Sequence, residues 1–284
     1  MTGIEASLLA DGRRLHLHHG PIDLIVEAFG AGRQNAYDRA VRRFQGLLQE
    51  LVDELPQLRL PADKDRDFNG PVARRMQRAA CLFLPQFLTP MAAVAGAVAD
   101  EILQAMSAGT GIDKIYVNNG GDVAFLLGPG QRMEAAIAAD VGGRIVIGES
   151  DSCRGVATSG WGGRSHSLGI ADSVSTVALN AATADAAATL ISNAVDLPGH
   201  DAIKRIPARD LFPDSDLGRR LVTYDVGRLT ASEIGRALDR GAEYAATLVA
   251  QNTIAGAVLT LHGQFRQVGT EPLVARQTGE LAYA

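Results

Sequence analysis

The feature that most constrains the fold of this chain is a change of sequence pattern at Lys114. From there on, short apolar runs alternate with glycines, which is typical of strands joined by tight turns. The strands predicted in this part of the chain are 115–117, 123–127, 135–137, 144–147, 155–157 and 173–179.

Helical spacing of apolar residues marks other parts of the chain. It predicts a helix over 37–55 that Pro56 stops, and further helices over 71–84, 90–106, 182–194 and 230–249. Hairpins are predicted over 15–29, around Gly20-Pro21, and at the end of the chain near His262-Gly263, with another strand over 221–224. Because helical and strand-rich segments alternate irregularly, we expect an α+β fold with mixed, mostly antiparallel sheets and packed helices.

Composition excludes several classes of protein. The 284 residues carry a net charge of −5, and 46% of them are hydrophobic, which argues against a disordered chain and against an electrostatic nucleic-acid binder. Two cysteines, Cys81 and Cys153, cannot form a disulfide framework. The N-terminus lacks a secretory signal, and the longest apolar stretch, 90–99, is shorter than the roughly 20 residues that span a membrane. We therefore expect a soluble cytoplasmic protein with no nucleic-acid or membrane partner.

A first candidate site is the segment Asn118-Asn119-Gly120-Gly121-Asp122, between two predicted strands. Adjacent glycines allow backbone N–H groups to approach a ligand, and the flanking amide and carboxylate oxygens suit hydroxyls or a cation. The alternative is a hairpin turn, because hairpins need this same residue chemistry. The sequence leaves both open.

A second candidate is the glycine-rich stretch 155–169, in which the strand residue Ala157 leads into Thr158, Ser159 and Gly160. Arg164 and His166 follow, so the loop offers backbone donors, a guanidinium that can bind phosphate and one titratable imidazole. It matches neither a P-loop nor a dinucleotide-binding fingerprint. The alternative is a surface loop with a structural histidine.

A third candidate lies at the start of the predicted helix 182–194. Asp185 and Thr189 are four residues apart, so the carboxylate and the hydroxyl share one helix face. Together they form an incomplete site for Mg²⁺, which uses phosphate and water as further ligands. The alternative is structural, with Thr183 as the N-cap and Asp185 in the first turn.

Three histidines near the first hairpin turn, His16, His18 and His19, are a weaker candidate. His16 and His18 share a strand face, but no nearby carboxylate or cysteine completes a ligand set, so we interpret them as surface imidazoles. The arginine-rich segments 39–43 and 74–78 are interpreted as solvated helix faces.

The order of the three candidate segments resembles the ApbE superfamily of flavin transferases, and in particular its shorter branch, uncharacterised protein family 0280. The resemblance covers about residues 15–195. It depends on five short matches in order, which are 89–100, Asn118 to Asp122, 157–160, 165–167 and 184–189. ApbE enzymes hydrolyse FAD with Mg²⁺ and attach FMN to a Thr or Ser of a flavoprotein.

The resemblance implies a role for each matched residue. Asp185 and Thr189 match the family's magnesium ligands, and Ala157 lies where a backbone carbonyl ligand is expected. Residues Asn119, Gly120, Gly121 and Asp122 match the nucleotide loop, and Thr158, Ser159 and Gly160 are expected to contact the ligand. His166 matches the family's histidine, so we expect His166 and Arg164 to be the catalytic pair.

The sequence also departs from the transferases. Residues 167–173 run directly into a strand in place of the Asp-Pro-x-x-Gly element that follows the histidine there. The half of the site that binds metal and phosphate is retained, whereas the missing element argues against FMN transfer.

The sequence therefore predicts an ApbE-like α+β protein that binds or acts on a phosphate-bearing flavin (FAD or FMN) or nucleotide with Mg²⁺. As an enzyme it would be an FMN transferase or an FAD pyrophosphatase. As a protein without catalysis it would be a flavin, nucleotide or pterin carrier, or a structural subunit of a cofactor or one-carbon pathway, and a homodimer is left open. We expect residues 1–284 to form one unit or two intertwined subdomains. The motifs lie in a core of about 89–195, and 200–284 complete the sheet.

Overall fold

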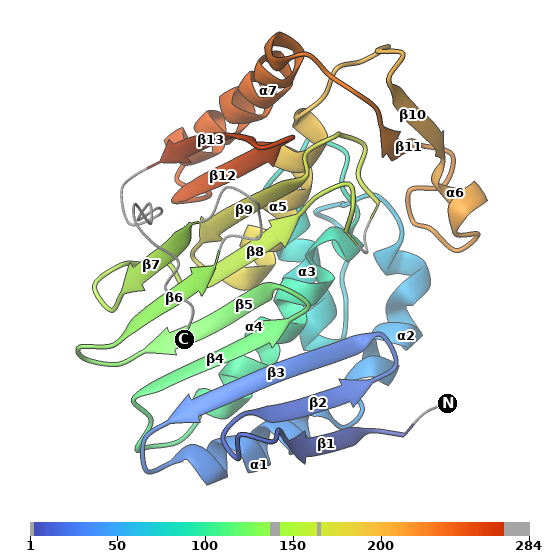
Figure 1. Ribbon diagram of the computed structural model, residues 1–284. Coiled ribbons are helices and arrows are strands. Elements are labelled where there is room, and N and C mark those ends of the chain that lie inside the picture. The colour runs from blue at the N-terminus through green and yellow to red at the C-terminus, as the bar shows by residue number, and fades with distance from the viewer. Residues whose placement is uncertain (1–2, 137–142, 164–165, 270–284) are drawn as a thin grey trace.

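A nine-stranded antiparallel sheet organises the computed structural model, which describes residues 3–136, 143–163 and 166–269 (Figure 1). Its strands follow the order β1-β2-β3-β4-β5-β8-β9-β12-β13, and each neighbouring pair is antiparallel. These strands are β1 (Glu5–Leu8), β2 (Leu15–His19), β3 (Ile22–Phe29), β4 (Lys114–Asn119), β5 (Asp122–Leu127), β8 (Gly155–Ser159), β9 (Ser173–Ala178), β12 (Gly256–Leu261) and β13 (Gln264–Gly269).

The helices cover one face of this sheet (Figure 1). They are α1 (Arg33–Phe44), α2 (Leu47–Leu58), α3 (Pro71–Cys81), the 3₁₀ turn η1 (Pro90–Ala93), α4 (Val94–Ser107), α5 (Ala181–Ala194) and α7 (Ala231–Ala250). The large core lies between helices and sheet and is rich in alanine on α4 and α5. Because alanine side chains are small, the backbones of these two helices can pack close to each other and to the sheet.

The opposite face of the sheet is covered in part by a hairpin of β6 (Arg132–Ala136) and β7 (Arg144–Gly148). Met133, Ile145 and Ile147 of this hairpin pack with Phe125 and Val156 of the sheet in a second, smaller core. A further hairpin of β10 (Ile203–Pro207) and β11 (Leu221–Val226) stands apart from the large sheet and carries the short helix α6 (Ala208–Leu211) (Figure 1). We call residues 203–226 the hairpin lobe.

The α+β class with antiparallel sheets and packed helices is confirmed. The predicted strands and helices recur with shifted ends, except that Ile137 lies outside the described residues. The prediction of a single helix over 37–55 is wrong. The chain breaks at Gly46, which has a φ of +81°, and α2 then continues through Pro56 to Leu58. Glycine adopts this backbone conformation without steric cost, so the break falls there.

No helix within the described residues is long and apolar enough to cross a membrane. Three elements, β1, β10 and α6, were not predicted. The division of the chain into one unit or two intertwined subdomains remains a prediction.

Candidate functional site

Helices α4 and α5 cap each other's N-termini. Asp100 of α4 accepts hydrogen bonds from the backbone N–H groups of Ala181 and Ala182, at 3.0 and 2.9 Å. Asp185 of α5 accepts one from the N–H of Gly96, at 3.0 Å. A Cβ on Gly96 would lie 2.2 Å from the carbonyl oxygen of Ala181, so only glycine allows this approach. The reciprocal caps fix the Asp185 carboxylate at the first turn of α4.

The structural alternative, with Thr183 as the N-cap and Asp185 in the first turn of α5, is therefore wrong. The N-cap of α5 is Asn180, whose side chain accepts from the N–H of Thr183 at 2.8 Å, and Thr183 lies inside the helix. Asp185 is in the second turn, where its carboxylate does not serve its own helix. Its position is explained by α4, which has no side-chain cap of its own.

The turn between β4 and β5 brings a second carboxylate to the same place. Gly120 and Gly121 have φ values of +65° and +114°, and Asn118 Oδ1 accepts from the N–H of Gly121 at 2.9 Å. The hairpin-turn interpretation of the glycine pair is thus confirmed. Immediately beside the turn, Asn119 and Asp122 are paired across the two strands, with their side chains toward the helices.

Asn119 and Asp122 tie this turn to neighbouring elements. The Asn119 amide donates to the carbonyl of Ala95 in α4, at 3.1 Å, and the Asp122 carboxylate accepts from the N–H of Thr158 in β8, at 3.0 Å. The Asp122 contact extends the link between β5 and β8 beyond their last paired residues, Val123 and Val156. The strand ends and the first turn of α4 therefore meet around one point.

Electrostatics distinguish this point from an ordinary helix cap. The pKa of Asp185 lies well above its usual value, chiefly because burial disfavours the charge and also because the negative charge of Asp122 is close. The backbone N–H groups of Gly96 and Ala95 act in the opposite direction without cancelling these effects. A bound cation would relieve the repulsion of the two carboxylates, which makes Asp122 and Asp185 the carboxylate pair on which a metal site would be built.

The other two predicted metal ligands are Thr189, through its side chain, and Ala157, through its backbone. Asp185, Thr189 and Asn193 are partly accessible positions on α5 spaced four residues apart, so their side chains share one helix face. Ala157 is fully buried in β8 and faces the helices, so only its backbone can act as a ligand. The described residues contain no cluster of three or more His, Cys, Asp or Glu suited to a metal. This donor set fits Mg²⁺, which binds through one or two carboxylates, water and substrate phosphate.

The end of β8 positions the predicted ligand-binding residues 158–160. The Thr158 hydroxyl hydrogen-bonds that of Ser175 at 2.8 Å, while its backbone N–H is held by Asp122. Ser159 is half-buried at the last position of the strand. A Cβ on Gly160 would lie 2.2 Å from the carbonyl oxygen of Asp172, so this glycine is required by backbone packing.

His166 packs against the hairpin lobe. Its ring lies 5.0 Å from that of Phe212 in the hairpin lobe, measured between centroids. Asn193 holds the adjoining loop by accepting from the N–H of Leu168 at 2.8 Å and from the Ser167 hydroxyl at 3.2 Å. Asn193 is eight residues beyond Asp185, or about 12 Å along the helix axis. Arg164 lies outside the described residues.

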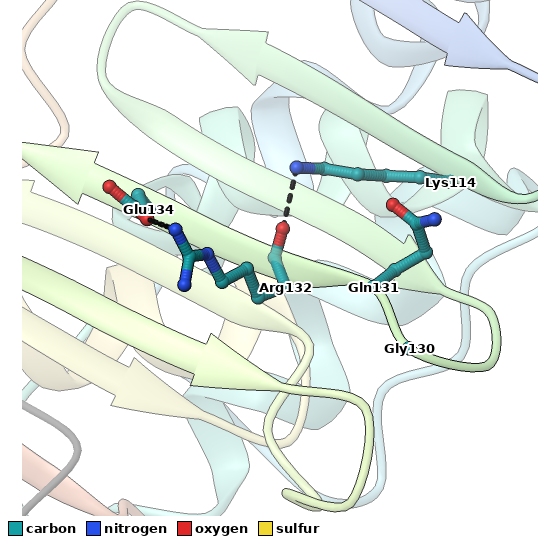
Figure 2. Close-up of a pocket in the computed structure, with 5 residues that line it drawn as sticks. All are labelled: Lys114, Gly130, Gln131, Arg132 and Glu134. Carbon is teal, nitrogen blue, oxygen red and sulfur yellow. Dashed lines mark hydrogen bonds and ion pairs between the residues drawn. The ribbon is translucent and has the colours of Figure 1, made fainter.

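A separate surface cavity of about 530 Å³ lies away from these residues (Figure 2). It is lined by Lys114, Gly130, Gln131, Arg132 and Glu134. The Lys114 ammonium donates to the carbonyl of Arg132 at 2.6 Å, and Arg132 pairs with Glu134 at 2.9 Å (Figure 2). Lys114 begins β4 and Asn119 ends it, which separates the cavity from the carboxylate pair by about 17 Å. Its cationic groups are already paired, so we do not assign it the predicted chemistry.

Two further outcomes concern a histidine outside this site and two residues that shape the site. His16 Nε2 hydrogen-bonds Asp23 Oδ1 at 2.9 Å, so a carboxylate does lie beside this histidine, and its role as a surface imidazole remains an interpretation. Asp100 and Gly96 were missed as determinants of the site. The signal for Asp100 was its place at the end of the long apolar stretch, but nothing in the sequence pointed to its partners 81 and 82 residues away.

Comparison with known proteins identifies relatives of the chain. The sequence model of a family described as AbpE bacteria matches residues 6–267. A UPF0280 protein of Methanothrix thermoacetophila is 37% identical over 158 residues, which are 52% of this chain and 63% of the relative. A UPF0280 protein of Methanopyrus kandleri is 40% identical over 125 residues, covering 43% of this chain and 48% of the relative. The chain thus matches less than two thirds of the length of either protein.

Two solved structures are similar over most of their length. An apo flavinyl transferase ApbE from Pseudomonas stutzeri has a TM-score of 0.46 and 12% identity, with 95% of each chain covered. A mutant of the flavin transferase ApbE from Vibrio cholerae has a TM-score of 0.47 and 14% identity, with 91% of this chain and 98% of that chain covered. The predicted relationship to the ApbE-like UPF0280 proteins is confirmed by the family and sequence matches.

Proposed function

Because this chain belongs to the AbpE bacteria family, we propose that it binds a phosphate-bearing flavin or nucleotide together with Mg²⁺ and acts on its phosphate group. The observation that supports this proposal is the carboxylate pair. Asp122 and Asp185 are held by the backbone N–H groups of Thr158 and Gly96, respectively. Burial and the nearby charge of Asp122 raise the pKa of the Asp185 carboxyl, and a cation bound beside the two carboxylates would offset both effects. A helix cap alone would need only one of these carboxylates.

Each residue of the site has a distinct task in this proposal. Asp122 and Asp185 hold the cation, with the Thr189 hydroxyl and the Ala157 carbonyl as further oxygen ligands. When bound, Mg²⁺ supplies charge stabilisation at the phosphoryl oxygens. The turn leaves space for a ligand beside Gly121, since a Cβ there would meet no atom within 4 Å, while the Gly121 N–H itself donates to Asn118.

The loop after β8 supplies polar groups to the side of the phosphate that faces away from the cation. Arg164 pairs with phosphate oxygens, and the His166 imidazole gives or accepts a proton at the bond that is broken. The backbone and hydroxyl groups of Thr158, Ser159 and Gly160 line the path between the two ends. FMN transfer to an acceptor protein is a narrower activity that this proposal does not require.

The test is to incubate the full-length protein with FAD and MgCl₂ and to analyse FMN, AMP and protein-bound flavin by chromatography and mass spectrometry. Asp185→Asn should abolish product formation while keeping an oxygen that can accept from Gly96. Asp100→Asn is the matched control, because it alters the other reciprocal cap and removes no proposed ligand.

Loss of product in both variants to the same degree would mean that the carboxylates matter only for folding. Saturable binding of FAD by the wild-type protein without product would replace catalysis by a carrier role. The proposal as a whole is refuted if the wild-type protein neither forms product nor binds FAD, FMN or pyrophosphate in the presence of Mg²⁺.

A further inference from the structure

The hairpin lobe holds an exposed aromatic side chain beside the candidate site. Phe212 follows α6 and is 60% exposed, an unusually large exposure for a phenylalanine. Its ring packs against that of His166 with a tilt of 44° between their planes. One face of His166 is thereby fixed, and Phe212 presents apolar surface next to a residue of the proposed site.

Several contacts fix the lobe in this position. The N–H of Thr223 in β11 donates to the carbonyl of Ser167 at 2.9 Å, which joins the lobe to the loop that carries His166. Asp216 accepts from the hydroxyl of Thr89, just before η1. The guanidinium of Arg220 lies 3.2 Å from the centroid of the Phe87 ring. Phe212 is therefore held against the body of the protein although its own side chain is open.

The lobe and the carboxylate pair lie at two ends of one helix face. Asp185 and Thr189 are at one end, and Asn193, which binds the loop of His166, is at the other, about 12 Å along α5. A ligand that reaches both ends must be elongated, with a phosphate group at one end and a different group at the other. Inorganic phosphate or pyrophosphate would occupy only the carboxylate end.

The aromatic residues nearer in sequence to the candidate loops are engaged by other residues. Phe125 is buried in the second core, and the Tyr116 hydroxyl donates to Glu27 at 3.0 Å. The indole N–H of Trp161 donates to Asp172 at 3.2 Å. Planar rings of ligands pack on aromatic side chains through dispersion and quadrupole interactions. Phe212 offers such a face, and His166 supports it from behind.

We infer that Phe212 is the platform on which the planar ring of the ligand packs, while its phosphate is held at Asp122 and Asp185. This inference depends on the proposed function and narrows it to elongated ligands with a flat ring, such as FMN or FAD. Phe212 is a specificity residue in this arrangement and takes no part in proton transfer.

The experiment compares two probes, FMN and inorganic pyrophosphate, each titrated calorimetrically with Mg²⁺ into the full-length protein. Phe212→Ala should weaken FMN binding about tenfold, equivalent to about 1.4 kcal/mol, and leave pyrophosphate binding unchanged. Phe212→Tyr, which keeps the ring, should restore most of the FMN affinity. Tyr224→Ala is the matched control, because Tyr224 is an aromatic residue of the same lobe that is 53% exposed, and its ring is not the one that packs on His166.

The outcomes separate this inference from the proposed function. Unchanged FMN affinity in Phe212→Ala would overturn the inference and leave Phe212 as a contact for another protein. Equal weakening of FMN binding and pyrophosphate binding would also overturn the inference. Phe212 would then affect the phosphate site and not the binding of a ring. If the wild-type protein binds neither probe, the proposed function fails first, and the inference fails with it.

Discussion

Replacement of Asp185 by asparagine should separate the two roles of this carboxylate. Asparagine keeps an oxygen that can accept from the N–H of Gly96, so the cap on α4 is retained. The negative charge beside Asp122 is removed. Any change in stability that depends on charge therefore reports on the carboxylate pair and not on the cap.

The pH dependence of stability has a definite sign in the absence of metal. The pKa of Asp185 is raised above its ordinary value of 3.8, so the folded state holds its proton more tightly than the unfolded state. The stability that this provides is complete below pH 3.8 and is lost as the pH rises through the raised pKa. At neutral pH without metal, Asp185→Asn should accordingly be at least as stable as the wild-type protein.

Magnesium should reverse this order. At a concentration 100 times the Kd, a ligand that binds only the folded state stabilises it by about 2.7 kcal/mol. For a protein of 284 residues this corresponds to an increase in Tm of about 4–5 °C. Asp185→Asn should lose most of this increase, and Asp185→Ala should lose it too while also losing about 1 kcal/mol from the missing cap.

The assay is thermal unfolding followed by circular dichroism at pH 4, 5.5 and 7, with EDTA and with MgCl₂ plus pyrophosphate. Asp100→Asn is the control, because Asp100 caps α5 and is not a proposed ligand. An equal response of wild-type protein and Asp185→Asn to Mg²⁺ would refute the carboxylate pair as a cation site. A marked loss of stability in Asp185→Asn with EDTA at pH 7 would refute the repulsion.

The remaining predictions concern stability away from the cation. Gly96→Ala should cost about 1–3 kcal/mol by overpacking against Ala181, whereas Gly235→Ala in α7, with its nearest atom at 3.7 Å, should gain about 0.5–1 kcal/mol in urea unfolding. The pKa of Glu233 is lowered to about 2, chiefly by the N–H of its N-cap residue, so its stabilisation is present above pH 4.5 and is lost toward pH 2. Glu233→Gln should flatten the Tm profile in that range, and an unchanged profile would contradict this assignment. The buried Thr223 hydroxyl has no partner among the described residues, so Thr223→Val should change the free energy of unfolding by less than about 1 kcal/mol. A larger loss in that variant would indicate a bound water or ligand group.

The sequence predicted most of the fold because its local signals agree with the tertiary structure. Apolar runs separated by glycines became the strands from β4 to β9, and Thr230 at the predicted helix start became the N-cap of α7 in a capping box. The break at Gly46 was missed because the apolar spacing continues across it. Strand β10, which pairs with the predicted strand β11, was missed because a register shift at Lys204 and Arg205 interrupts the alternation of its side chains.

The site could be predicted only in part. Its segments were identified by a resemblance, and the electrostatic influence of Asp122 on Asp185 joins residues 63 positions apart. Local patterns carry no information on such contacts. The same reason explains why the structural alternative places the helix cap at Thr183, since the observed arrangement depends on Asn180 and on Asp100 from another helix. Phe212, in a segment without a motif, gave no signal at all.

The reciprocal capping of α4 and α5 has a consequence for the order of folding. Each helix start is completed by a carboxylate 81 to 89 residues away, so neither is finished by local contacts. Closing such long loops costs more chain entropy than forming a local cap, so we expect both caps to form late in folding. Since Asp185 is both a cap and a proposed ligand, the proposed cation site would form in that same step. Partly folded forms of the chain, with the two helices undocked, would lack it.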